Sequence, residues 1–266
     1  MKNTLAVCFL ILFLPYTITL LVNGREGIHQ ETQMSELEYQ TLSALLEEDF
    51  SWMDEETLAL MAVLFRTECM RTGNEQITED LQEEASEDGD YERLYQAVEE
   101  TVGQLVTIDG EYRELPWHAL SAGQTRDGAL LGEEYSYIKS VECPLDVQAD
   151  GSLQSFILSE EEFAEALGTD IMPEELEIAR DGTDYVISAS AGDVSWQGEE
   201  LRELLHLLSS CFWLECQDGQ IHLTVKGSGH GFGISLHTAD CMTREGSTRE
   251  EILQTFYEGA ECITVP

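Results

Sequence analysis

Glycine occupies every second position, at 227, 229, 231 and 233, in the segment from Lys226 to Ser235, where it surrounds His230. In an extended segment this spacing leaves one side without side chains, so a second backbone or a ligand must approach closely. Two uses of that surface remain open. Another segment of the same protein packs there around a structural histidine, or a flat polymeric substrate binds there.

The first 24 residues contain one charge, Lys2, followed by an uncharged stretch from Thr4 to Val22 that is long enough to cross a bilayer as a helix. A cleavable signal peptide has a shorter apolar core and a small-residue exit, whereas the exit here reads Leu-Val-Asn-Gly. We therefore favour an uncleaved transmembrane anchor over residues 1–24, with a juxtamembrane linker over residues 25–36. Lys2 predicts a single-pass membrane protein with the bulk of the chain extracytoplasmic.

The charge balance restricts the partners of the chain. It carries 53 acidic against 13 basic residues, a net charge of −40. Nucleic acid and anionic lipid are excluded as main partners, because binding to them depends on lysine and arginine. A basic protein partner or bound cations fit this charge.

The periodicity of apolar residues changes along the chain. Helical spacing dominates the first hundred residues, with helices predicted at 35–48, from a Ser51 cap to 70, and at 91–101. Strands are predicted at 105–108 and 184–189 and in a hairpin, 212–215 with 220–225, around Asp218-Gly219. Further helices are predicted at 158–167, 199–208 and 247–258. Helices followed by strands favour an α+β fold.

Several blocks occur in the order found in one protein family. The longest runs without a gap from Glu48 to Thr67 and keeps two glutamates and an Arg-Thr pair. The others are Thr101-Val-Gly-Gln-Leu-Val-Thr, His118-Ala-Leu-Ser-Ala-Gly-Gln-Thr, Tyr137-Ile-Lys-Ser-Val-Glu-Cys-Pro-Leu-Asp, Gly198-Glu-Glu-Leu-Arg-Glu-Leu-Leu and the glycine run. Together they resemble the stage II sporulation protein D (SpoIID) family of lytic transglycosylases, from about residue 37 to 258.

The resemblance implies a catalytic domain over residues 37–266. It implies an enzyme that cleaves MurNAc–GlcNAc bonds of peptidoglycan glycan strands, gives a 1,6-anhydro product, and acts in cell wall degradation during sporulation engulfment. The resemblance also implies that the protein acts together with the stage II sporulation amidase (SpoIIP), within an engulfment complex at the membrane. It implies no cofactor.

Site residues are carried over from the same blocks. Glu48 matches the position of the catalytic acid and Glu56 is the second candidate, although both positions also suit ordinary surface carboxylates. Arg66 would pair with one of these acids or form a plain salt bridge. The predicted substrate contacts are Arg66, His118, Ser121, Tyr137, Lys139, Asp146 and His230. Tyr137 and Lys139 would share one face of a strand.

The sequence also departs from the family pattern. Residues 74–100 hold no histidine or cysteine, where some members have a metal-site pattern, so we predict no metal. Ala122, Gln124 and Leu236 replace a glycine, a lysine and a glutamine of the pattern. The alternative functions are therefore a catalytically weak member that binds glycan or activates an amidase, and an acidic surface protein that shares only the fold.

Overall fold

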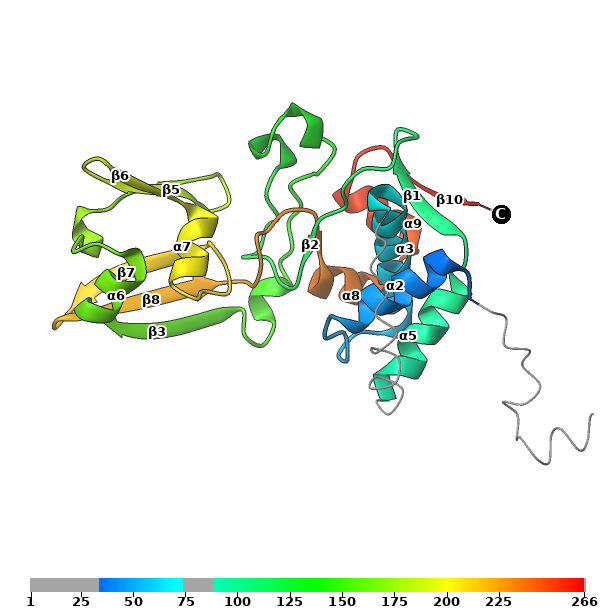
Figure 1. The fold of residues 1–266 in the computed structure, drawn as a ribbon, viewed down its shortest axis with the longest axis horizontal. Helices are drawn as coiled ribbons and strands as arrows, with labels where there is room; N and C mark the ends of the chain where they lie inside the picture. Colours follow the sequence, from blue (N-terminus) through cyan, green and yellow to red (C-terminus); the bar gives the residue numbers. More distant parts are fainter. Residues whose placement is uncertain (1–33, 74–88, 266) are drawn as a thin grey trace, which may run out of the picture.

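The computed structural model describes residues 34–73 and 89–265 and shows two lobes joined by a narrower central region (Figure 1). Each lobe has its own cluster of buried apolar side chains. The chain builds most of the first lobe, crosses the centre to build the second, and returns through the glycine run. The first and last described segments therefore lie in the same lobe.

The first lobe packs helices against a two-stranded sheet. Its central helix is α3 (Glu55–Thr72), most of whose residues are buried, as its apolar composition predicts. The other elements are α2 (Glu36–Leu46), α5 (Gly89–Glu100), β1 (Gln104–Ile108), α8 (Leu236–Arg244), α9 (Arg249–Phe256) and β10 (Ala260–Thr264). Strand β10 pairs antiparallel with β1, which joins the end of the described chain to its early part.

Helix α3 begins at a different cap from the predicted one. The side chain of Asp54 accepts a hydrogen bond from the backbone N–H of Glu56, so Asp54 is the N-cap. Ser51 bonds to Asp49 in the preceding turn instead. Gly73 ends the helix in the left-handed conformation, at φ 63°.

The second lobe is formed by two three-stranded antiparallel sheets and two short helices. One sheet has the order β3-β8-β7 and the other β4-β5-β6. The predicted hairpin around Asp218-Gly219 is confirmed as β7 and β8, with both turn residues at positive φ. The elements are β3 (Leu153–Ser159), α6 (Glu160–Leu167), β4 (Glu177–Arg180), β5 (Val186–Ala191), β6 (Val194–Gln197), α7 (Gly198–Leu204), β7 (Phe212–Gln217) and β8 (Gln220–Lys226).

The central region consists of two chain passages that lie side by side. The outgoing passage contains β2 (Trp117–His118) and the returning one contains β9 (Ile234–Ser235), and these strands pair in parallel. Single bridges from Leu120 to Ser228 and from Arg126 to Phe232 extend the contact. The glycine run is therefore the returning passage between the lobes.

The predicted fold class needs a correction. The mixture of helices and strands is present, but none of the helices over residues 34–73 and 89–265 is long and apolar enough to span a membrane. The predicted transmembrane anchor, residues 1–24, and linker residues 25–33 lie outside the described residues. The last linker residues belong to the folded lobe, since Ser35 caps α2 and Glu36 begins it.

Candidate functional site

The glycine run approaches other parts of its own chain. All four glycines have positive φ, so the segment is not the regular extended strand that the sequence predicted. A Cβ at Gly229 would lie 2.5 Å from the Cβ of His118, and one at Gly233 would lie 1.8 Å from the carbonyl oxygen of Pro116. The close approach inferred from the spacing is present, and the outgoing passage provides it. Of the two uses left open, the structure favours packing within the protein.

Two predicted contacts, Ser121 and Asp146, form a buried hydrogen-bond network. One carboxylate oxygen of Asp146 accepts from the backbone N–H of Ser121 at 2.9 Å and from its hydroxyl at 2.6 Å. The hydroxyls of Ser235 and Thr238 donate to the same carboxylate at 2.6 and 2.7 Å. Asp146 is fully buried, so this network fastens the outgoing passage to β9 and the start of α8.

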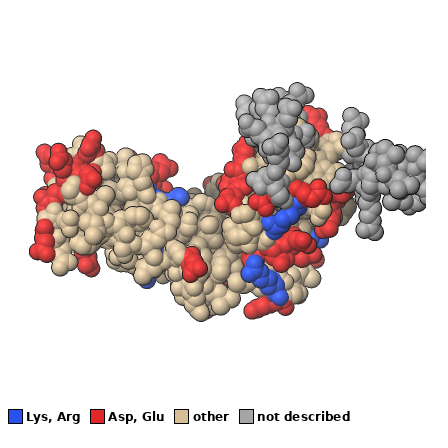
Figure 2. Space-filling view, turned by 90° about the horizontal axis from the view of Figure 1, so that it is seen from below, with Lys and Arg blue, Asp and Glu red and all other residues tan. Residues whose placement is uncertain are grey.

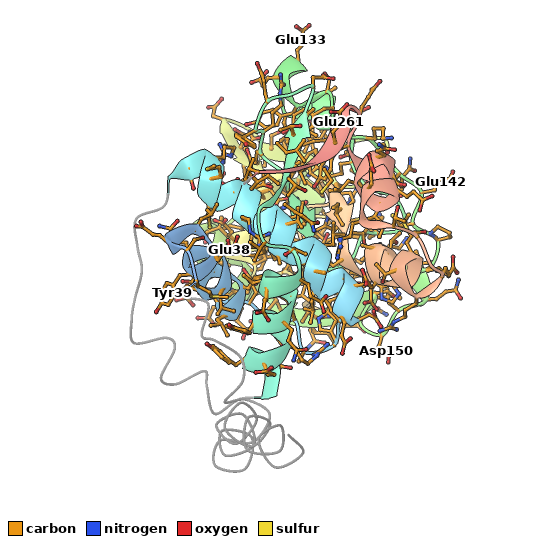
Figure 3. The ribbon with its side chains drawn as sticks, turned by 90° about the vertical axis from the view of Figure 1, so that its right-hand side faces the viewer. Glu38, Tyr39, Glu133, Glu142, Asp150 and Glu261 are labelled. Atoms are coloured by element: carbon orange, nitrogen blue, oxygen red, sulfur yellow. The ribbon has the colours of Figure 1, made fainter. Side chains whose placement is uncertain are left out.

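Arg66 is also fully buried, and its partner is Glu38 on α2. Its Nε donates to Glu38 at 2.7 Å, and the other guanidinium nitrogens donate to Thr101 and to the carbonyl of Val98 at 3.1 and 3.0 Å. Figure 3 places Glu38 on α2 beside α3. The sequence led us to expect Glu48 or Glu56 as the partner. The sequence did not identify Glu38 as the partner of Arg66, although Glu38 lies four residues before Leu42 on the buried face of α2.

Tyr137 lies in a turn and Lys139 in a segment without regular secondary structure, so neither belongs to a strand. Tyr137 is buried and its hydroxyl donates to the carbonyl of Glu114 at 2.5 Å, while burial raises the pKa of Tyr137 to about 12. Lys139 donates from Nζ to the carbonyl of Gln254. Both polar ends are therefore bound to backbone in this structure.

The two central histidines are neighbours, with ring centroids 5.8 Å apart. His118 is buried, its Nδ1 lies 3.1 Å from the carbonyl of Phe232, and its Nε2 lacks a partner among the described residues. Since a carbonyl only accepts, Nδ1 carries the proton. Burial, and to a smaller extent His230, lowers the pKa of His118 to about 3. His118 is therefore neutral at physiological pH.

His230 also lines a cavity of about 320 Å³ at the side of the first lobe that faces the centre. The lining combines apolar and aromatic side chains with carboxylates: Leu64, Phe65, Glu68, Glu114, Leu115, Pro116, Trp117 and His230. Phe50 packs edge-on against Phe65 and Trp117, with centroids 6.0 and 5.7 Å apart. Aromatic faces beside hydrogen-bonding carboxylates suit a sugar.

Glu48 and Glu56 are both exposed, at opposite ends of the connection between α2 and α3. Glu48 follows α2 and stands two residues before Phe50, which packs behind the lining residues Phe65 and Trp117 and does not itself line the cavity. Partial burial raises the pKa of Glu48, and the nearby charge of Glu47 adds to this. Glu56 lies in the first turn of α3 and forms an ion pair with Arg249 at 3.4 Å.

The structure thus separates the predicted residues into three groups. His230 lines the cavity, whereas Glu48 and Glu56 are exposed on the surface and do not line it. Arg66, His118, Ser121, Tyr137 and Asp146 are held inside the protein. The sequence did not identify Glu68, Glu114 or Trp117 as lining residues, although Trp117 directly precedes a predicted contact. In the described parts of the chain, no group of three or more His, Cys, Asp or Glu side chains is arranged to hold a metal.

Comparison with known proteins agrees with the sequence blocks. The chain is 28% identical over 173 residues to stage II sporulation protein D of Bacillus amyloliquefaciens and 27% identical over 173 residues to that of Bacillus subtilis (strain 168). Each alignment covers 64% of this chain and 50% of the relative, so the match spans about half the length of these curated relatives. No family model matches the chain.

Proposed function

Two curated homologues support membership of this chain in the stage II sporulation protein D family, and on that premise we propose that it is a peptidoglycan lytic transglycosylase. The homologues support a function connected with sporulation. The proposed reaction is cleavage of the bond between MurNAc and GlcNAc in glycan strands. By resemblance, the amidase SpoIIP would first remove the stem peptides, within an engulfment complex.

The observation that carries the proposal is the position of Glu48. A lytic transglycosylase needs one carboxyl group that is protonated before reaction and accessible to the substrate. The Glu48 side chain is accessible to solvent, yet neighbouring protein atoms bury part of it. This partial burial raises the pKa of Glu48, as a catalytic acid requires. Phe50, two residues further on, packs against Phe65 and Trp117 of the cavity wall, which connects this turn to the wall.

In the proposed step, Glu48 gives its proton to the oxygen that leaves C1 of MurNAc as the glycosidic bond breaks. The resulting carboxylate then takes the proton of the C6 hydroxyl, whose oxygen bonds to C1. The product is a 1,6-anhydro ring and no water is consumed. A single carboxyl group serves as acid and then as base, in contrast to the two used by most glycoside hydrolases.

The side chains around the cavity would bind the sugar. Trp117 and Phe65 offer aromatic surface to a pyranose ring, and Glu68 and Glu114 can accept hydrogen bonds from its hydroxyls. Glu68 is also paired with Arg71 at 2.6 Å, so the negative charge of Glu68 is balanced next to the cavity.

The test is digestion of peptide-free glycan strands by the purified protein, with mass spectrometry of the ends. We expect 1,6-anhydromuramic ends from the wild type and a loss of about a hundredfold or more in their rate of formation for Glu48→Gln. Glu47→Gln is the matched control because it removes the adjacent exposed carboxylate. It should retain most of the activity, with a small loss because the charge of Glu47 helps to raise the pKa of Glu48. Glu56→Gln tests the second predicted acid.

The outcomes separate the competing functions. If Glu47→Gln and Glu48→Gln lose activity equally, the assignment of Glu48 as the catalytic acid is wrong. If only Glu56→Gln loses activity, Glu56 is the catalytic acid. If the wild type forms no anhydro ends but pellets with the glycan, the protein is a binding or amidase-activating member of the family. That alternative is favoured by the burial of several motif residues in structural bonds.

A further inference from the structure

Strand β3 (Leu153–Ser159) forms one edge of the β3-β8-β7 sheet. All seven of its residues pair with β8 in a continuous register, from Leu153 opposite Lys226 to Ser159 opposite Gln220. On its other side, the described part of the chain places no strand, and Figure 1 shows β3 along the outer margin of the lobe. A row of backbone N–H and C=O groups is therefore available for pairing.

The side chains of β3 include none of the features that prevent an edge strand from pairing with another strand. Its sequence, Leu-Gln-Ser-Phe-Ile-Leu-Ser, has no charge and no proline, in a chain of which 25% of residues are charged. Leu153 is 59% exposed and Ile157 is 55% exposed, and they lie on the same face of the strand. Natural edge strands are protected by lysine, proline, bulges or short length, and a long apolar edge without them pairs readily.

The other edges in this lobe carry such protection. Strand β4 bears Glu177 and Arg180 and has a register shift before Arg180. Strand β7 packs against the short helix η5 (Pro173–Glu175), and β6 has only four residues. Among the described strands of the second lobe, β3 is therefore the long, regular and uncharged edge.

The surroundings of β3 decide which kind of partner fits. Asp150 precedes the strand and Glu160 and Glu161 follow it, all exposed, with Asp150 pointing outward in Figure 3. Figure 2 shows an uncharged surface on this lobe with acidic side chains gathered at its outer end. A positively charged segment would be attracted, whereas two copies, each with a net charge of −40, would repel each other.

We propose that β3 is a docking edge for an extended, positively charged segment of a protein partner, which adds to the sheet as a further strand. Backbone hydrogen bonds along β3 hold the segment. Its apolar side chains pack on Leu153 and Ile157, and its basic side chains meet the acids at the two ends of the strand. This interaction does not depend on glycan cleavage.

The test uses the protein and a fluorescent peptide of about eight residues, in which alternating valine and threonine are flanked by lysines at both ends. Two control peptides separate the contributions. One replaces lysine with glutamate, which reverses the charge, and the other keeps the sequence but carries N-methylated backbone nitrogens, which cannot pair. Fluorescence anisotropy gives the dissociation constants, and sedimentation velocity gives the oligomeric state.

Two protein variants locate the site. Ile157→Lys places a charge on the docking edge, and Ile187→Lys places the same charge at a 40% exposed position on the central strand of the other sheet. We expect Ile157→Lys to weaken binding of the lysine peptide about tenfold and Ile187→Lys to leave it within about twofold. Neither control peptide should bind measurably.

Several results would overturn the proposal. These are no binding of the lysine peptide, equal binding of its N-methylated form, or equal weakening by both variants. A wild-type dimer that Ile157→Lys dissociates would show that a second copy occupies the edge instead. Because no glycan is present, none of these results depends on whether Glu48 is the catalytic acid.

Discussion

Buried ionisable groups in this protein are satisfied in two different ways. Arg66 and Glu38 form a buried ion pair, and further hydrogen bonds satisfy the remaining guanidinium nitrogens. His118 has no acidic partner and stays neutral because burial lowers its pKa to about 3. The second arrangement makes the folded state depend on pH.

The sign of that dependence follows from proton binding. An unfolded histidine titrates near its usual pKa of about 6.5, so below that pH the unfolded chain binds a proton that folded His118 does not. His118 therefore lowers the free energy of unfolding as pH falls from about 6.5 towards 3, by about 2 kcal/mol at pH 5. We expect His118→Asn, whose amide N–H can replace the Nδ1 donor, to lose this contribution.

The measurement is urea unfolding of wild type and variant at pH 7 and pH 5. The chain has 53 acidic residues, whose repulsion also changes with pH, so the informative quantity is the difference between the two proteins. His222→Asn, on β8, serves as the control and should follow the wild type. The same pH dependence in wild type and His118→Asn would contradict the assignment.

Elements with local signals could be predicted from the sequence, and contacts between distant segments could not. The β7–β8 hairpin follows from Asp218-Gly219, and the start of α6 from the Ser159 cap. The spacing of the glycine run indicated a close approach but not what approaches. Ser121 and Asp146 were predicted as substrate contacts because they match positions in the blocks that resemble the family. Asp146 is bound by the hydroxyls of Ser235 and Thr238, about ninety residues further along the chain, and no local pattern reveals those contacts.

The returning passage through the centre gives a direct test of glycine packing. Gly233 has φ 71°, and an added Cβ would meet the Pro116 carbonyl oxygen at 1.8 Å; Gly192 has φ 59° with nothing within 4 Å. Gly192→Ala should cost about 1 kcal/mol, from the left-handed conformation alone. Gly233→Ala should cost more than about 3 kcal/mol, because β2 and β9 must also move apart. Urea unfolding gives the free energy of unfolding of both variants. Equal losses would show that the backbone around Gly233 moves to accommodate a methyl group at little cost.

The two lobes have separate apolar cores, so their coupling depends on the polar contacts of the central region. Arg126, on the outgoing passage, donates to Asp181 of the second lobe at 2.6 Å and to the carbonyl of His230 on the returning passage at 3.1 Å. Its guanidinium also lies over the rings of Phe232 and Tyr185. This one side chain therefore connects both passages to the second lobe.

Removing the charge of Arg126 should uncouple the lobes. The ion pair with Asp181 is almost completely buried, and loss of one partner leaves the other carboxylate uncompensated, at a cost of about 3 kcal/mol. Because that cost falls on the second lobe and the centre, we expect Arg126→Met to unfold in two calorimetric transitions where the wild type shows one. Arg202→Met, which breaks a partly exposed pair with Glu199, should change stability by less than about 1 kcal/mol and keep one transition. A single transition in Arg126→Met, shifted to lower temperature, would mean that the backbone pairing of the passages alone keeps the lobes cooperative.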